Sequence, residues 1–87
     1  MRILYFAWLR ERVGTGEEIV DPPADVSSVA GLIAWLSTRS AGHAAAFAPS
    51  AEGRHLVRCA VNQDFAAPET PVSAQDEIAF FPPVTGG

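Results

Sequence analysis

One stretch decides the fold: residues 28–39, SVAGLIAWLSTR. At about 100° per residue, its larger aliphatic side chains fall within one arc of about 100°, the width expected of a helix that lies on a sheet. These side chains are Val29, Leu32, Ile33 and Leu36. Ser27 or Ser28 is placed to cap the helix by accepting a hydrogen bond from an unpaired backbone N–H. The stretch predicts a main helix over about 28–39.

Segments typical of β-strands flank this helix on both sides. They are rich in strand-favouring side chains or show two-residue alternation, and turn-forming residues separate them. The five segments are residues 2–7, 17–21, 55–62, 65–67 and 76–81. The order β-β-α-β-β-β predicts an α+β domain in which one main helix covers one face of a mixed five-stranded sheet.

Two connecting segments have weaker patterns. Residues 8–13 fit a short helical turn between the first two strands. Residues 40–53 are rich in alanine and contain proline and glycine, so we expect a loop, with a helical turn near 44–47 as the alternative. His43 and His55 have no acidic or cysteine partner at metal-ligand spacing, so we expect ordinary surface or loop residues and no metal site.

Length and composition exclude several classes of protein. A chain of 87 residues has room for one domain, here residues 1–81, followed by a tail, residues 82–87. Hydrophobic residues make up 48% and charged residues 18%, a balance typical of a folded domain. The net charge is −4 and the six cationic side chains, all arginine, are scattered, so nucleic acid is not an expected partner.

The single cysteine, Cys59, excludes an internal disulfide, and it lies on the inward face of a predicted strand. We therefore expect a small buried side chain and not a nucleophile. No apolar stretch approaches the roughly 18–20 residues that a bilayer span needs. The default expectation is a cytoplasmic protein.

The sheet face away from the helix is expected to carry apolar side chains. Leu4 and Phe6 on the first strand, and Ala79 and Phe81 on the last, share this face, while Phe65 lies on a short edge segment. Such a patch on a small domain predicts a docking surface. The alternative is that residues 40–53 cover this face.

The C-terminus carries the strongest chemical signal. Pro82-Pro83 ends the last strand and stiffens the chain, and Val84-Thr85-Gly86-Gly87 follows. Six extended residues span up to roughly 20 Å, and glycine has no Cβ, so a narrow channel in another protein could hold this end. The Gly87 carboxylate is a poor electrophile until joined to AMP, after which a sulfur nucleophile displaces AMP. The alternative is a frayed end without a role.

The chain resembles the small subunits of molybdopterin synthase, which are ubiquitin-like β-grasp sulfur carriers, over essentially its whole length. The residues that carry the resemblance are Leu4-Tyr5-Phe6-Ala7, Leu9-Arg10-Glu11, Ser28-Val29, Ala60-Val61-Asn62-Gln63, and Asp76 through Gly87, DEIAFFPPVTGG. One departure is Gln75, where relatives often have glycine in the turn before the last strand.

The resemblance implies a sulfur-donating subunit without turnover of its own. An E1-like enzyme would consume ATP to adenylate Gly87, and a sulfur donor protein would convert it to a thiocarboxylate. The tail, with Val84, Thr85 and Gly86, would then enter the large subunit, whose lysines are catalytic. Sulfur would pass to the cyclic pyranopterin monophosphate precursor, and two transfers would make the molybdopterin dithiolene.

The same resemblance implies contacts and an assembly. Phe6, Phe65 and Phe81 are expected to make apolar contacts with partner proteins, and Arg10 a polar one. The assembly is expected to be a heterotetramer with a central large-subunit dimer, and no cofactor or metal is expected on the chain. Three alternatives stay open: a sulfur carrier for thiamine or another thiolation pathway, a ubiquitin-like modifier that forms isopeptide bonds with lysines, and an interaction module whose tail does no chemistry.

Overall fold

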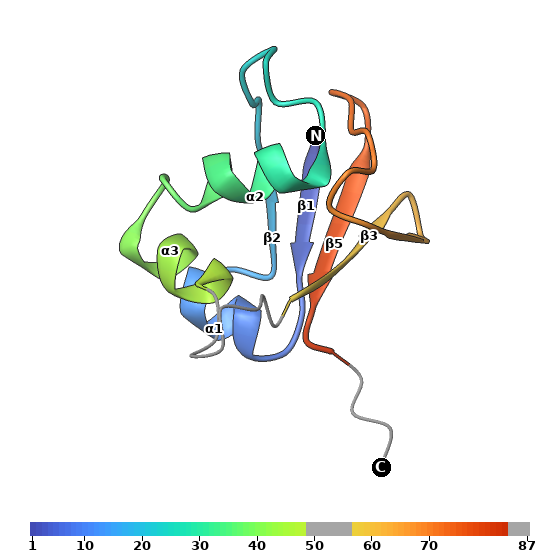
Figure 1. The fold of residues 1–87 in the computed structure, drawn as a ribbon. Helices are drawn as coiled ribbons and strands as arrows, with labels where there is room; N and C mark the ends of the chain where they lie inside the picture. The colour runs from blue at the N-terminus through green and yellow to red at the C-terminus, as the bar shows by residue number, and fades with distance from the viewer. Residues whose placement is uncertain (49–56, 84–87) are drawn as a thin grey trace.

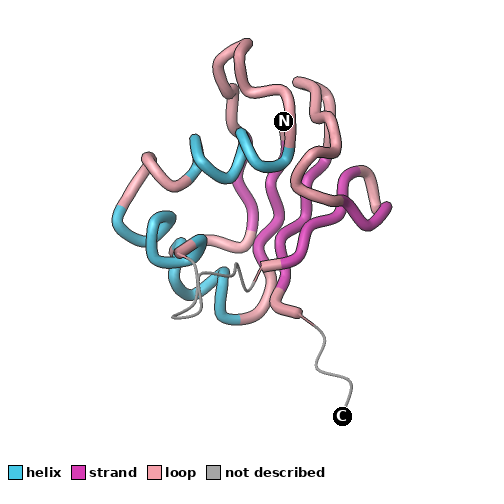
Figure 2. The backbone as a smooth tube through the Cα atoms, in the orientation of Figure 1, coloured by secondary structure: helices cyan, strands magenta, loops and turns pink. Residues whose placement is uncertain are grey.

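The protein was analysed as a computed structural model, in which the structure describes residues 1–48 and 57–83. Figures 1 and 2 show a sheet with helices on one side. Along the chain the elements are β1 Arg2–Tyr5, α1 Trp8–Val13, β2 Glu17–Ile19, α2 Val29–Leu36, α3 Ala41–Phe47, β3 Arg58–Val61, β4 Asp64–Ala66 and β5 Glu77–Phe81. The predicted α+β class and the order of the five strands are confirmed.

The five strands form one mixed sheet in the order β2-β1-β5-β3-β4. The central strands β1 and β5 are parallel, with Ile3 opposite Ile78 and Tyr5 opposite Phe80. The other three neighbouring pairs are antiparallel. Because β1 and β5 run the same way, the N-terminus and the end of β5 lie at opposite ends of the sheet (Figure 1).

The main helix, α2, forms where the sequence predicts it, although it ends three residues early. Ser28 is its N-cap, and its hydroxyl accepts a hydrogen bond from the backbone N–H of Gly31 (3.2 Å). At the other end, the N–H groups of Thr38 and Arg39 bond to carbonyls three residues back instead of four. The α-helical pattern therefore stops at Leu36 and continues as a tighter turn.

The expectation of a loop at 40–53 is wrong for residues 41–47, which form helix α3, whereas the helical turn considered near 44–47 lies within this helix. Ser40 caps α3 by accepting a hydrogen bond from the N–H of His43 (3.1 Å). The ring of Phe47, which is 2% exposed, packs edge-on against Phe80 at 4.9 Å between centroids. Because α3 lies on the same side of the sheet as α2, its described residues do not cover the opposite face (Figure 1). Residues 49–53 lie outside the described part.

Backbone conformation sets the ends of several strands. Strand β1 stops at Tyr5 because Ala7 has a φ of 56°, which no strand residue adopts. Asn62 and Gln63 also have positive φ values, 51° and 73°, as a two-residue type I′ hairpin between β3 and β4 requires. Gln75 is not among the positive-φ residues, so its turn does not need glycine. The start of the predicted strand 55–62 lies outside the described residues.

The core fills the space between the sheet and the three helices. Ile3, Leu9, Leu32, Leu36, Ile78 and Phe80 are all fully buried. Tyr5, 1% exposed, stacks on Phe80 with ring centroids 6.1 Å apart. Both tryptophans lie at the margin of the core, and an arginine guanidinium lies over each ring: Arg12 over Trp8 and Arg39 over Trp35. The parallel pair β1–β5 therefore supplies the centre of the core.

A close approach of α1 and α3 generates the first prediction. A Cβ atom on Gly42 would lie 2.2 Å from the carbonyl oxygen of Arg12, so Gly42→Ala must push the two helices apart. We expect a loss of about 1–3 kcal/mol in the free energy of unfolding, measured by urea denaturation. The matched control is Gly31→Ala in α2, where the nearest atom would be 3.5 Å away and alanine favours the helix. Equal effects of the two substitutions would contradict the described packing.

Candidate functional site

The end of β5 is where the predicted chemical tail begins. Phe81 ends the strand, and the described chain continues through Pro82 and Pro83. The predicted tail residues Val84, Thr85, Gly86 and Gly87 lie outside the described residues. The structure therefore defines the base from which the tail starts, at the end of the sheet opposite the N-terminus (Figure 1).

The sheet face away from the helices carries apolar side chains next to this base. Strand register places Leu4 and Ala60 opposite Ala79, and Phe65 opposite Ala60, so these residues share one face. The rings of Phe65 and Phe81 contact each other with centroids 6.0 Å apart. Phe65 is 87% exposed, a large fraction for an aromatic ring. We call Leu4, Ala60, Phe65, Ala79 and Phe81 the apolar patch.

Phe6 lies at the end of the apolar patch. It directly follows β1, and its N–H donates to the carbonyl oxygen of Phe80 (3.1 Å), which keeps it beside β5. Its side chain is 48% exposed. The structure thus brings the three predicted aromatic contacts, Phe6, Phe65 and Phe81, to the same end of the sheet as the tail.

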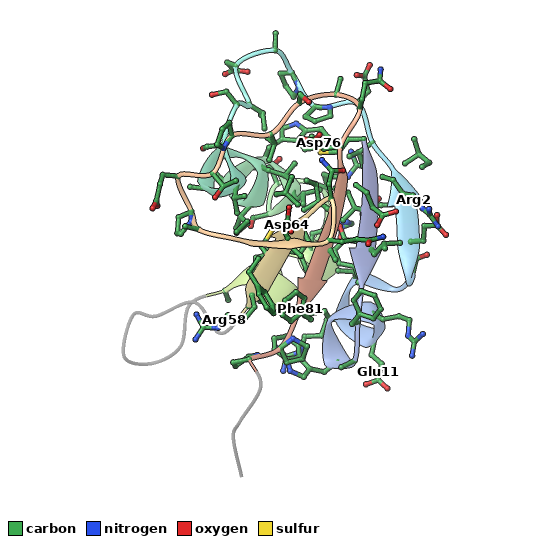
Figure 3. All side chains as sticks on the ribbon, turned by 90° about the vertical axis from the view of Figure 1, so that its right-hand side faces the viewer. Arg2, Glu11, Arg58, Asp64, Asp76 and Phe81 are labelled. Carbon is green, nitrogen blue, oxygen red and sulfur yellow. The ribbon has the colours of Figure 1, made fainter. Side chains whose placement is uncertain are left out.

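Arg10 is separated from this patch. It is an exposed residue of α1, and its aliphatic chain lies over Gly16, in the connection between α1 and β2, where an added Cβ would be 2.9 Å from the Arg10 Cδ. Arg58 is the cation that sequence reasoning did not single out. It lies opposite Phe81 in the sheet, and Figure 3 shows both at the tail end of the open face.

The far half of the open face is charged. Arg2 on β1 forms ion pairs with Glu17 on β2 and with Glu77 on β5, the latter at 3.2 Å. Both carboxylates and the guanidinium are partly exposed, so these pairs add little stability. The open face therefore has an apolar half beside the tail and a polar half toward the N-terminus.

Two small hollows border β3. One of about 370 Å³ is an open depression bounded by Phe65, Phe81 and Arg58 on the open face. The other, of about 240 Å³, lies between α2 and the β3–β4 edge, lined among others by Ile33 and Pro68. The hollow between α2 and the β3–β4 edge is smaller than a typical small-molecule site, which measures roughly 300–1,000 Å³. The described residues also contain no His, Cys, Asp or Glu group that could hold a metal ion.

Cys59 is buried, as predicted from its strand position. Its side chain is 6% exposed, and burial raises the pKa of the thiol to about 11. A thiol with this pKa is protonated at neutral pH and is therefore a poor nucleophile. Cys59 accordingly serves as a small packing residue of the core.

The expectation that His43 is an ordinary surface or loop residue is wrong, because it is 8% exposed and hydrogen-bonded at both ring nitrogens. Its Nε2 lies 2.8 Å from Glu18, and because a carboxylate only accepts, Nε2 carries the proton. In the neutral ring, Nδ1 then accepts from the Ser40 hydroxyl (2.7 Å). The Tyr5 hydroxyl donates to the same Glu18 oxygen (2.6 Å). His55 lies outside the described residues.

This buried network shifts the pKa values of two of its members, Glu18 and Tyr5. Burial alone would raise the pKa of Glu18, but hydrogen bonds from His43 and Tyr5, with the nearby Arg39, lower it overall. Burial and the hydrogen bond to Glu18 raise the pKa of Tyr5. The network joins β1, β2 and α3, and with all of its buried polar atoms paired it has a structural role.

Comparisons with known proteins agree with this geometry. The model of the ThiS family matches residues 3–87. The chain is 38% identical over 87 residues to the molybdopterin synthase sulfur carrier subunit of Escherichia coli (strain K12), covering 100% of this chain and 99% of the relative. The corresponding subunit of Haemophilus influenzae is 34% identical with the same coverage.

A solved structure extends the likeness to the whole fold. Small archaeal modifier protein 1 of Haloferax volcanii superposes with a TM-score of 0.77 at 28% identity, covering 97% of each chain. The described residues of our chain include no helix long and apolar enough to cross a membrane.

The Glu18 network generates the second prediction. We expect Glu18→Gln to lower the free energy of unfolding at pH 7 by about 1–3 kcal/mol, because it leaves buried donors with a weaker acceptor. Since the folded-state pKa of Glu18 lies below its usual 4.5, this contribution is present above pH 4.5 and is lost as the pH falls below it.

Chemical denaturation at several pH values measures this effect. The matched control is Glu17→Gln, the neighbouring residue on β2, which pairs with Arg2 on the exposed face. We expect the control to change stability by less than about 1 kcal/mol. A Glu18→Gln deficit that stayed constant down to pH 3 would show that the ionised carboxylate is not what stabilises the fold.

Proposed function

We propose, from the premise that the chain belongs to the ThiS family, that it is the sulfur carrier subunit of a molybdopterin synthase. The observation that carries the proposal is the end of β5: a Pro-Pro-Val-Thr-Gly-Gly sequence starts beside an exposed apolar patch, on a chain that is 38% identical over its whole length to such a carrier. The working group is the carboxyl group of Gly87, and the chain is a donor of sulfur within an enzyme complex.

The proposed chemistry takes place on the terminal carboxyl group alone. An E1-like enzyme transfers AMP from ATP to the Gly87 carboxylate, releasing pyrophosphate and forming a mixed anhydride. A sulfur donor protein then supplies sulfur at the oxidation level of hydrosulfide, which attacks the acyl carbon; the bond to the AMP oxygen breaks, AMP leaves, a proton is released and a thiocarboxylate results. No side chain of the carrier takes part, which suits a domain whose thiol is buried and in which His43 is hydrogen-bonded at both ring nitrogens.

The apolar patch is the proposed docking surface for the large subunit and for the activating enzyme. Burying an exposed ring such as Phe65 contributes roughly 1.5–3 kcal/mol, enough to anchor a complex of moderate affinity. The open depression between Phe65 and Phe81 has room for a partner side chain, and Arg58 at its rim suits a carboxylate. Phe6 adds apolar area at the tail end, and Arg10 offers a cation on α1.

Docking at this face directs the tail into the partner. Six residues beyond Phe81 can reach roughly 20 Å, so Gly87 can enter a catalytic pocket of the large subunit while the domain stays outside. There the thiocarboxylate sulfur passes to the cyclic pyranopterin monophosphate precursor, and two such transfers complete the dithiolene of molybdopterin. The proposed assembly is a heterotetramer with a central large-subunit dimer, acting in the cytoplasm, with ATP consumed only by the activating enzyme.

A second candidate is a protein modifier. It is favoured by the similarity to small archaeal modifier protein 1, which covers 97% of the chain. In that case the activated Gly87 would form isopeptide bonds with lysines of other proteins. A carrier for thiamine or another thiolation pathway would share the chemistry at Gly87 and differ only in its acceptor.

Removing the terminal residue gives the third prediction. We expect the chain without Gly87 to fold and to bind a molybdopterin synthase large subunit, but to support no molybdopterin formation, since the reacting carboxyl group is displaced by one residue. Intact mass of the untagged full-length protein from its own host should show a form heavier by the sulfur-for-oxygen difference at Gly87. Molybdopterin formation by the truncated protein would refute the proposal, and higher-mass lysine conjugates would favour the modifier.

The apolar patch gives the fourth prediction. We expect Phe65→Ala to weaken binding to the large subunit about 10- to 100-fold, as loss of an anchoring ring does, while unfolding stability stays within about 0.5 kcal/mol. Ile19→Ala is the matched control, because Ile19 is 72% exposed on β2, at the other edge of the sheet. Calorimetric titration measures both. If the control weakened binding as much as Phe65→Ala, the docking surface would lie elsewhere.

A further inference from the structure

An activated acyl group reacts with any amine or thiolate that reaches it, so the chain's own nucleophiles matter. All six cationic side chains of the sequence are arginines, and a guanidinium is protonated and a poor nucleophile at neutral pH. The sequence therefore contains no side-chain amine and one thiol, that of Cys59, and the structure describes one further amine, the amino group of Met1. Both are among the described residues.

The amino group of Met1 is held in the sheet. It donates a hydrogen bond to the carbonyl oxygen of Val20 (3.1 Å), while the Met1 carbonyl oxygen accepts from the Val20 N–H (2.9 Å). Attack on an acyl group would require this pair to open. The parallel pairing of β1 with β5 also places Met1 at the opposite end of the sheet from Pro83 (Figure 1).

Cys59 lies close to Phe81, from which the tail starts, but its side chain is buried. It is opposite Phe80 in the register of β3 and β5, only one residue before Phe81. Its side chain is 6% exposed and packs within the core cluster. Because burial also raises the pKa of the thiol to about 11, the reactive thiolate is scarce at neutral pH.

We propose that this chain does not act as an acceptor of its own activated terminus: the Met1 amino group is hydrogen-bonded to Val20 at the opposite end of the sheet from Pro83, and the Cys59 thiol is largely buried in β3. The inference rests on the proposed function, in which Gly87 is activated. Aminolysis would form a C–N bond, break the acyl–oxygen bond to AMP and release the amine proton. Because neither the same molecule nor a second copy offers an accessible amine, the acyl group persists until a sulfur nucleophile from another protein attacks it.

The test uses the full-length chain ending in a thioester at Gly87, made chemically through an intein fusion with mercaptoethanesulfonate. This activated end needs no activating enzyme, so the result does not depend on whether the chain serves molybdopterin synthesis. Incubation at pH 8 and intact mass spectrometry distinguish hydrolysis from rings and covalent dimers. We expect the wild-type protein to yield neither ring nor dimer, and added hydrosulfide to give the thiocarboxylate.

A matched pair of variants makes the test specific. Glu11 is exposed on α1, and Figure 3 shows it at the end of the molecule where Phe81 leads into the tail. Glu11→Lys adds an amine there, whereas Glu11→Arg makes the same change of charge without one. We expect amide-linked product from Glu11→Lys to form at least about tenfold faster than from Glu11→Arg or the wild type, because the acceptor is held near the tail.

Two results would overturn the inference. One is a ring or dimer from the wild-type protein at the rate of Glu11→Lys, with peptide mapping placing the new bond at Met1 or Cys59. The other is a Glu11→Lys variant whose thioester is as unreactive as that of the wild type. In that case, the absence of amine acceptors would not be what protects the Gly87 thioester from aminolysis. Failure of the proposed function would look different: an inert thioester together with no thiocarboxylate on protein from its own host.

Discussion

The parallel pairing of the first and last strands is the constraint on which the rest of the structure depends. It places β5 in the centre of the sheet, with Ile78 and Phe80 fully buried between neighbours on both sides. A strand in that position cannot form until β1 and β3 are available to pair with it. The tail that follows β5 therefore starts from the central strand of the sheet, at the end opposite the N-terminus.

The one-sided arrangement of helices follows from the same sheet and determines where a partner can bind. All three helices pack on one face, and the other face carries, among the described residues, the apolar patch beside the tail and the ion pairs of Arg2 toward the N-terminus. Arg58 and Phe81 lie opposite each other at the end of β5, so the proposed docking surface lies beside the start of the proposed reactive tail. In the proposed function, the affinity of a complex and the placement of its reacting group would depend on the same few residues.

Patterns local in sequence predicted most of this fold, and features set by distant contacts were missed. The aliphatic arc of residues 28–39 was sufficient for α2, and two-residue alternation predicted that Phe81 shares the open face while Cys59 is buried. Helix α3 was missed because its alanines show no amphipathic pattern. Its position depends on His43 bonding to Glu18, 25 residues earlier, and on Phe47 packing against Phe80. The tail prediction at Val84–Gly87 stays a prediction.

The pairing of the buried polar groups and the choice of arginine as the cation both suit a chain that is proposed to carry an activated carboxyl group at Gly87. Every buried side-chain nitrogen and oxygen among the described residues has a partner, and the one free thiol, that of Cys59, is buried. Arginine provides all the cationic side chains, which gives the surface positive charge without amines. A lysine in place of any exposed arginine would keep the charge and the fold yet add a competitor for the acyl group. In the proposed function, the persistence of the activated end therefore depends on the residue types of the whole domain, and not only on the two terminal glycines.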